Sequence, residues 1–311
     1  MQYITHNGTT FSRFQLGTVQ LGMTYGLGDH TAKPTKEYAF SLLDQAMAGG
    51  VNTLDTANNY GDSQHVIGEW LKTVPAEKRP FIITTIGPFD HSSDEALRAD
   101  IRRQTEGCLS DLGVKKLDML MVHMFEDYEK DPETVREVFM QMKEEGLIGM
   151  TGISAYSRHD YKKIAASGFE AVQIPLNVFD WERIDDGGLQ AMADAGMTIF
   201  VRSVYLQGLV FLTPETLDPR MDFCLPYLNK FISFCEEFDM SPAVLALSFV
   251  LSLDGISAAV LGVQTNEQMA QNCELFENVR MLSQKQMELL HDAFAEIDPR
   301  VINPGCWFNK F

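Results

Sequence analysis

The sequence predicts an α/β fold, namely a closed (β/α)8 TIM barrel in which residues 1–311 form a single domain. Eight apolar segments of strand length alternate with amphipathic helical segments, which is the order expected of a parallel sheet covered by helices. The chain is long enough for a full barrel. No GxGxxG fingerprint follows the first predicted strand, because residues 17–22 read Gly-Thr-Val-Gln-Leu-Gly. This pattern disfavours an open dinucleotide-binding sheet.

The predicted strands are short runs rich in Val, Ile, Leu, Met and Phe, as expected of strands that are buried on both faces. They span residues 14–17, 51–55, 81–85, 119–123, 150–154, 171–174, 198–202 and 258–261. Residues 1–13 precede the first strand and contain Asn7-Gly8, a two-residue turn signal. We therefore expect a short N-terminal hairpin that closes the bottom of the barrel.

The predicted helices repeat apolar residues at a spacing of three or four. They span residues 36–48, 63–72, 94–112, 132–145, 160–167 and 188–194. Gly49 and Gly113 each follow the end of a helix, and Pro132 occupies a first turn, as is typical of helix termini. The connection between the last two strands is the longest. It contains two more helical patterns, 221–238 and 242–253, and predicts an extended loop-helix insertion.

The composition excludes several classes of function. Lys and Arg number 25 against 43 Asp and Glu, and the net charge of −18 opposes binding to nucleic acids and anionic membranes. The 5 cysteines are widely spaced without a CxxC pair, so we expect neither a disulfide framework nor a metal site. There is no signal-peptide pattern and no apolar run of about 18 residues, so we expect a cytoplasmic protein. The sequence leaves the oligomeric state open.

Residues suited to proton transfer follow several predicted strands, at the edge where a parallel barrel binds ligands. Asp55 ends the second strand, Tyr60 lies five residues further on, and His123 ends the fourth strand. Each has a structural interpretation as well: the acid could cap a turn, the phenol could pack in a loop, and the imidazole could be hydrogen-bonded in the core. Their convergence on one mouth favours a site in which the phenol is a general acid.

The motif that contains these residues resembles a known signature. Asp55-Thr56-Ala57-x-x-Tyr60-Gly61, with Ser63 and Gly68-Glu69-Trp70-Leu71 downstream, is similar to that of the aldo-keto reductase family. Other matching segments follow in the family's order over nearly the whole chain: Leu16-Gly17-Thr18, Leu120-Met121-Val122-His123, Gly152-Ile153-Ser154, Gln173-x-x-x-Asn177 and Gly262-(x)9-Asn272. Residues 16–22 and 201–209 look most like a bacterial branch associated with sugar and cell-surface polysaccharide genes.

The resemblance implies a barrel that transfers hydride between a nicotinamide cofactor, NAD or NADP, and a carbonyl. Carried over by position, Tyr60 is the proton donor, His123 orients the carbonyl and Asp55 gives electrostatic support. The implied substrate is a small aldehyde or ketone that resembles a sugar, and no metal is implied.

The resemblance also implies where the cofactor lies. Ser154 and Gln173 would hold the nicotinamide amide, and Arg202 stands where many members stack an aromatic ring on the nicotinamide, a role that a planar guanidinium can also fill. The full set implied at the cofactor is Gly17, Thr18, Ser154, Gln173, Arg202, Ser203, Leu206, Gly208, Gly262, Gln264, Gln268 and Asn272.

One position departs from the family pattern. The family has a lysine at the end of the third barrel strand, and here Thr85 occupies its place. That ammonium stabilises the tyrosinate formed as the proton leaves, and an adjacent opposite charge typically shifts a pKa by about 1–3 units, or about 10- to 1000-fold in rate. Carbonyl reduction, which needs a neutral phenol, should suffer less than alcohol oxidation. The alternative is non-redox chemistry on sugars, as a lyase or isomerase, or reduced catalytic competence.

Two further segments bear on the ligands. Residues 261–268 contain no Lys or Arg and one Glu, which favours NAD over NADP, because a 2′-phosphate would find no cationic partner there. This segment could also simply be a polar helix start. Near the C-terminus, Trp307 and Phe308 could form a wall that stacks on a carbohydrate, or a hydrophobic tail docked on the side of the barrel.

Overall fold

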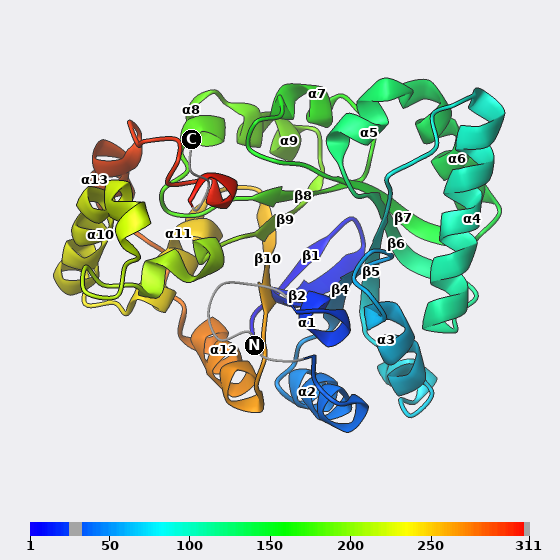
Figure 1. Cartoon of the computed structure of the whole chain (residues 1–311), viewed down its shortest axis with the longest axis horizontal. Helices are drawn as coiled ribbons and strands as arrows, with labels where there is room; N and C mark the ends of the chain where they lie inside the picture. The colour runs from blue at the N-terminus through cyan, green and yellow to red at the C-terminus, as the bar shows by residue number, and fades with distance from the viewer. Residues whose placement is uncertain (25–32, 308–311) are drawn as a thin grey trace.

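A computed structural model, which describes residues 1–24 and 33–307, shows eight parallel strands that close into a barrel (Figure 1). Around the ring these are β3 (Phe14–Gly17), β4 (Thr53–Ala57), β5 (Phe81–Ile86), β6 (Leu117–Val122), β7 (Ile148–Ser154), β8 (Ala171–Pro175), β9 (Thr198–Arg202) and β10 (Ile256–Gly262), which pairs with β3. Each of the eight predicted strands is present. The predicted fold class is confirmed.

Helices cover the outside of the barrel (Figure 1). Those after the first six barrel strands are α1 (Val19–Gly22), α2 (Lys36–Ala48), α3 (Ser63–Leu71), η1 (Ala76–Lys78), α4 (Asp94–Leu112), α5 (Phe125–Lys130), α6 (Pro132–Glu144), α7 (Tyr161–Ala165), α8 (Glu182–Asp185) and α9 (Gly188–Asp194). The long connection from β9 to β10 contains η2 (Leu206–Phe211), η3 (Pro219–Cys224), α10 (Leu225–Glu237) and α11 (Pro242–Ser252), which confirms the predicted insertion. After β10 come α12 (Asn266–Asn278), α13 (Gln284–Phe294) and η4 (Pro304–Cys306).

Several boundaries differ from the prediction; β6, for example, ends at Val122, so His123 follows this strand rather than ending it. Strand β4 covers residues 53–57 rather than 51–55, because it pairs residue by residue with β5, from Thr53 opposite Phe81 to Ala57 opposite Thr85. Asp55 therefore lies inside the strand rather than at its end. The single helix predicted for 221–238 is divided into η3 and α10, because a proline without an amide hydrogen occupies the first turn of α10.

An N-terminal hairpin closes the bottom of the barrel, as predicted. Strands β1 (Tyr3–His6) and β2 (Thr9–Ser12) pair antiparallel around Asn7 and Gly8, which both have the positive φ angles of a tight turn. Phe11 of this hairpin is fully buried, and its ring makes edge contacts with Phe81 at 5.2 Å and Phe200 at 5.4 Å. The hairpin thus supplies the lowest layer of the barrel core.

Alternation along the strands places polar side chains at the opposite end. Ile83 and Met121 belong to the apolar cluster inside the barrel, whereas Ile82 and Leu120 face the helices. Thr85 of β5 continues this inward alternation, and His123, which directly follows β6, lies beside it, with Oγ1 of Thr85 3.1 Å from Nδ1 of His123. The interior is therefore apolar below and polar at the mouth formed by the carboxyl ends of the strands.

The described part of the C-terminal tail is docked on the protein. Trp307 is only 2% exposed, and its indole nitrogen donates to the carbonyl of Arg300 at 3.0 Å. A ring held in this way offers no face for stacking, so Trp307 does not form the carbohydrate wall considered above. Phe308, the second member of that wall, lies outside the described residues.

Candidate active site

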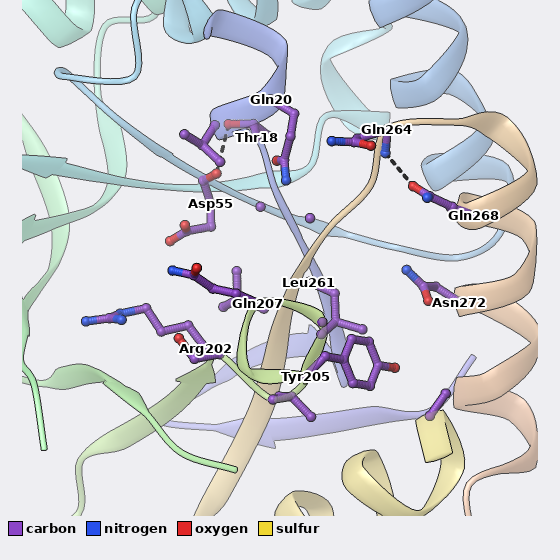
Figure 2. A pocket seen from close by; sticks show the side chains of 18 of the residues that line it. Thr18, Gln20, Asp55, Arg202, Tyr205, Gln207, Leu261, Gln264, Gln268 and Asn272 are labelled. Atoms are coloured by element: carbon purple, nitrogen blue, oxygen red, sulfur yellow. Dashed lines mark hydrogen bonds between the residues drawn. The ribbon is translucent and has the colours of Figure 1, made fainter. Parts of the chain in front are cut away.

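A cavity of ≈ 530 Å³ opens at the carboxyl ends of the strands. Twelve of the predicted site residues line it: Gly17, Thr18, Asp55, Tyr60, Gln173, Arg202, Ser203, Gly208, Gly262, Gln264, Gln268 and Asn272. Figure 2 shows Asp55 and Arg202 toward one end and Gln268 and Asn272 of α12 toward the other. The two charged side chains therefore lie toward one end of the cavity and the amides of α12 toward the other.

Asp55 is held at the mouth from two sides. Its backbone carbonyl accepts hydrogen bonds from the amide of Thr18 at 2.9 Å and from the hydroxyl of Thr18 at 2.8 Å. Its carboxylate oxygen Oδ2 accepts a 2.7 Å bond from Nε2 of Gln173. Because β4 and β8 stand on opposite sides of the ring, this bond spans the barrel. It fixes the direction in which the carboxyl group points.

The carboxyl group of Asp55 has an unusual protonation equilibrium. Burial raises its pKa from 3.8 to about 7, although the hydrogen bond from Gln173 and the charge of Arg202 both act to lower it. The side chain is 4% exposed, so water stabilises the anion poorly. Asp55 therefore changes its charge near neutral pH.

Two glycines place Tyr60 above the mouth. A Cβ atom on Gly22, at the end of α1, would lie 1.7 Å from the carbonyl oxygen of Tyr60, and one on Gly61 would lie 2.4 Å from the carbonyl of Gly22. Only glycine at both positions allows this approach. The loop is also tied to the neighbouring strand, because the amide of Asn58 donates to the carbonyl of Thr85 at 3.0 Å. The ring of Tyr60 then meets that of His123 edge to face, at 6.2 Å between centroids.

Ser63 links the Tyr60 loop to the barrel. Its buried hydroxyl donates to the carbonyl of Thr18 at 2.9 Å and lies 3.2 Å from the hydroxyl of Thr56. The contact joins the first turn of α3 to the ends of β3 and β4. The hydroxyl thereby fixes the helix start that follows Tyr60.

Replacing Ser63 with Ala should lower the free energy of unfolding by about 1–3 kcal/mol, because it leaves buried polar groups without their partner. Urea unfolding of Ser63→Ala measures this effect. Ser110→Ala, at an exposed position of α4, is the matched control and should change stability by less than about 0.5 kcal/mol. Equal stabilities of the two variants would show that the Ser63 contact does not hold the loop.

His123 is tied to the threonine at the end of β5. The hydroxyl Oγ1 of Thr85 lies 3.1 Å from Nδ1 of His123, and the amide of His123 donates to the carbonyl of Ile86 at 2.9 Å. Burial, with a smaller contribution from the charge of Arg202, lowers the pKa of the imidazole. His123 is therefore neutral at physiological pH, with one ring nitrogen engaged by Thr85.

Arg202 ends β9 on the opposite side of the mouth from Thr85. Its Nη2 donates to the carbonyl of Ala155 at 3.0 Å, and its guanidinium lies over the ring of Tyr156, 4.6 Å from the centroid. Among the described residues that line the cavity, Arg202 is the one cation and Asp55 the one anion. The mouth thus contains one charge of each sign.

The amide end of the cavity has a floor of glycine. Gly17 and Gly262 are paired across β3 and β10, and a Cβ atom on Gly262 would lie 2.3 Å from the side-chain nitrogen of Gln20. Beyond them α12 begins, where the side chain of Gln268 accepts a 2.7 Å bond from the amide of Gln264 (Figure 2). Asn272 lies one turn further along the same helix. The absence of a side chain on Gly262 thus lets Gln20 pack against the backbone at this end of the cavity.

Four predicted site residues lie outside the lining of this cavity. His123 and Thr85 are at the mouth beside Tyr60, as described above. Ser154 is buried and pairs with Gln173 in the register of β7 and β8. Leu206 is buried in the core, so it contributes packing rather than a cavity wall.

The sequence did not single out several residues that line the cavity: Gln20, Tyr205, Gln207, Phe211 and Gln271. Three of them belong to the loop after β9, where Ser203, Leu206 and Gln207 all have positive φ angles. Non-glycine residues rarely adopt that conformation, and no local sequence pattern announces it. The turn of this loop brings its aromatic and amide side chains to the cavity.

Within the described ranges, 1–24 and 33–307, no group of His, Cys, Asp or Glu side chains could hold a metal ion. In the same ranges, no helix is long and apolar enough to cross a membrane. The 5 cysteines are all free, and Cys108, Cys224 and Cys235 are buried.

Comparison with known proteins agrees with this geometry. The model of the "Aldo/keto reductase family" matches residues 14–294. An uncharacterised oxidoreductase of Bacillus subtilis, YqkF, is 24% identical over 297 residues, which are 89% of this chain and 94% of that protein. An aldo-keto reductase of Bacillus halodurans, solved in its holo form, superposes with a TM-score of 0.75 at 20% identity, covering 97% of this chain and 100% of that one. A glycerol dehydrogenase of Gluconobacter oxydans gives a TM-score of 0.75 at 21% identity, with 97% and 98% covered.

Proposed function

Because the chain belongs to the aldo/keto reductase family, we propose that it reduces a small aldehyde or ketone, of a sugar-like kind, with a nicotinamide dinucleotide and with Tyr60 as the proton donor. The observation that carries the proposal is the mouth itself. Asp55 and Tyr60 line one cavity, and the rings of Tyr60 and His123 meet edge to face there. A phenol and a neutral imidazole beside each other can both bond to one carbonyl oxygen.

The cavity fits an extended dinucleotide. Gly17 and Gly262 line it beside Gln20, and Gln173 at one end and Asn272 at the other offer amides for the two bases of the ligand. Ser154, next to Gln173, would hold the carboxamide of the nicotinamide. The bound dinucleotide supplies hydride to the carbonyl carbon.

The protein's own groups complete the reduction. His123, neutral because its pKa is lowered, donates from the ring nitrogen that Thr85 does not engage and orients the carbonyl oxygen. The phenol of Tyr60 gives its proton to that oxygen as negative charge develops there, and the tyrosinate recovers a proton from water. Asp55, which lines the same cavity, gives electrostatic support to this proton transfer. In this scheme Thr85 occupies the position of the family's lysine.

We expect the protein to bind NADH more tightly than NADPH. Neutral amides surround the far end of the cavity, and no described lining residue there carries a positive charge for a 2′-phosphate. Replacing Gln268 with Arg should tighten NADPH binding by about 10-fold, the effect of one hydrogen bond to a charged group, and should leave NADH binding nearly unchanged. Titration of tryptophan fluorescence measures both affinities.

The matched control is Gln284→Arg, which adds the same charge at an exposed position of α13 outside the cavity lining. It should leave both affinities as in the wild type. A similar gain in NADPH affinity from both variants would mean that the charge acts at long range and that Gln268 does not face the 2′-phosphate.

The function itself is tested by titration with NADH and NADPH, followed by turnover with aldehydes and keto-sugars. We expect saturable binding and slow reduction. Failure of both dinucleotides to bind below millimolar concentration would overturn the proposal. Binding without turnover of any carbonyl would favour the second possibility, elimination or isomerisation on a sugar, which does not need a lysine beside Tyr60.

A further inference from the structure

The mouth of the barrel carries its positive charge on an unexpected strand. Thr85 ends β5 beside His123, and no lysine is among the described residues that line the cavity. Arg202 ends β9, and β5 and β9 stand opposite each other in the ring. The cation therefore faces the reacting groups from across the mouth.

Arg202 is fixed in this position. Its Nη2 donates to the carbonyl of Ala155, and its Cζ lies over the ring of Tyr156, 4.6 Å from the centroid. Arg158 stacks on the same ring at 4.6 Å, but it is exposed and pairs with Glu126. Of the two arginines in contact with Tyr156, only Arg202 is among the described residues that line the cavity.

The charge of Arg202 acts on both neighbours of Tyr60. It lowers the pKa of Asp55, against the larger effect of burial, and it contributes to lowering the pKa of His123. An arginine stays protonated at every pH of interest, so its field is constant. Its planar group is also weakly hydrated, which suits a partly buried position.

We propose that Arg202 supplies from β9 the positive charge that the mouth lacks at Thr85, and that this charge stabilises the tyrosinate of Tyr60 during reduction. The inference rests on the proposed function. In the step concerned, the Tyr60 O–H bond breaks as a bond forms between that proton and the substrate oxygen. Hydride from the reduced dinucleotide adds to the carbonyl carbon, so the carbonyl is reduced and the dinucleotide oxidised. Arg202 acts through Tyr60 and is a positioning residue rather than a catalytic one.

The test moves the positive charge from β9 to β5 by substitution. Arg202→Met should lower kcat by about 10-fold or more, whereas Arg202→Lys, which keeps the charge, should retain most of it. Adding Thr85→Lys to Arg202→Met should restore most of the lost turnover. Thr85→Lys alone should change the wild-type kcat much less than it changes that of Arg202→Met, because the charge is already present.

Arg158→Met is the matched control, since it removes the other arginine from the ring of Tyr156 without touching the cavity lining. It should leave kcat unchanged. Equal effects of Arg158→Met and Arg202→Met would indicate that packing on Tyr156 matters and not the charge. If Thr85→Lys raised kcat by the same factor in the wild type and in Arg202→Met, a cation at position 85 would not replace the one at position 202. Either result would overturn the inference.

A second measurement needs neither cofactor nor turnover. The imidazole of His123, assigned among the 7 histidines by the loss of its NMR signal in His123→Gln, should titrate at higher pH in Arg202→Met and at lower pH again in the double variant. The titratable groups on which the charge of Arg202 acts are Asp55, His123 and Tyr161, while Tyr156 contacts its guanidinium and Tyr60 shares the cavity. If Arg202→Met left the titration of His123 unchanged, the inference would be overturned, even with an inactive wild type. A wild-type protein that neither bound a dinucleotide nor turned over a carbonyl would overturn only the proposed function.

Discussion

Replacing Tyr60 with Phe should lower kcat for carbonyl reduction by about 10²- to 10⁴-fold, the usual contribution of a positioned general acid. The ring of Phe can keep the edge contact with His123, while the variant removes the proton to be transferred. Dinucleotide affinity should stay close to that of the wild type, because the phenol faces the carbonyl in the proposed complex. Steady-state assays and fluorescence titration together measure both quantities.

Tyr3→Phe is the matched control for this experiment. It removes a phenol that donates to the carbonyl of Gly50 at 2.8 Å, at the hairpin end of the barrel. This variant should keep the kcat of the wild type. If Tyr60→Phe also kept it, another group would have to give the proton, and the proposed role of Tyr60 would be wrong.

The second large effect concerns stability. Asp55→Asn should stabilise the protein at pH 8 relative to the wild type, by up to about 4 kcal/mol, because about 3 pKa units separate the folded value of about 7 from the unfolded 3.8. The sign follows from proton binding. Between these two values the folded protein binds a proton at Asp55 that the unfolded chain has released, so this contribution to stability falls as pH rises. Below pH 4 both states are protonated and the contribution is complete.

Urea unfolding at a series of pH values measures the difference between wild type and Asp55→Asn. That difference should grow from pH 4 to pH 7 and then level off. Asp298→Asn is a control of opposite sign, because hydrogen bonds from Arg300 lower the pKa of Asp298 and its carboxylate stabilises the fold at neutral pH. A difference for Asp55→Asn that does not vary with pH would mean that this carboxyl group titrates normally.

The sequence could predict the barrel because each strand and helix has its own local pattern. Apolar runs and intervening helical periods are set by residues close together in the chain, and so is the Asn7-Gly8 turn of the hairpin. The ends of β4 could not be predicted in the same way, since its limits follow from pairing with β5. The strand continues as long as its neighbour offers hydrogen-bonding groups.

For the candidate site, the sequence could predict residues in local motifs but not the contacts between them. Asp55 and Gln173, predicted from motifs in two separate strands, meet through a hydrogen bond across the barrel. The contact between Thr85 and His123 depends on two side chains that are 38 residues apart, and the local pattern gives no sign of it. The loop that contains Gln207 has positive φ angles, which most residues avoid, so the sequence did not predict that this loop lines the cavity.

The hydrogen bond between Gln173 and Asp55 connects two halves of the barrel. Cutting the ring between β6 and β7 gives two half-barrels: the first contains Asp55, Tyr60 and His123, and the second contains Gln173 and Arg202. In the proposed reaction, the first half would carry the groups that transfer the proton, and the second the amide and the charge beside them. Neither half holds a complete site. The hydrogen bond from Gln173 to Asp55 is therefore a contact between the two halves, and it can form only when both are assembled into one ring.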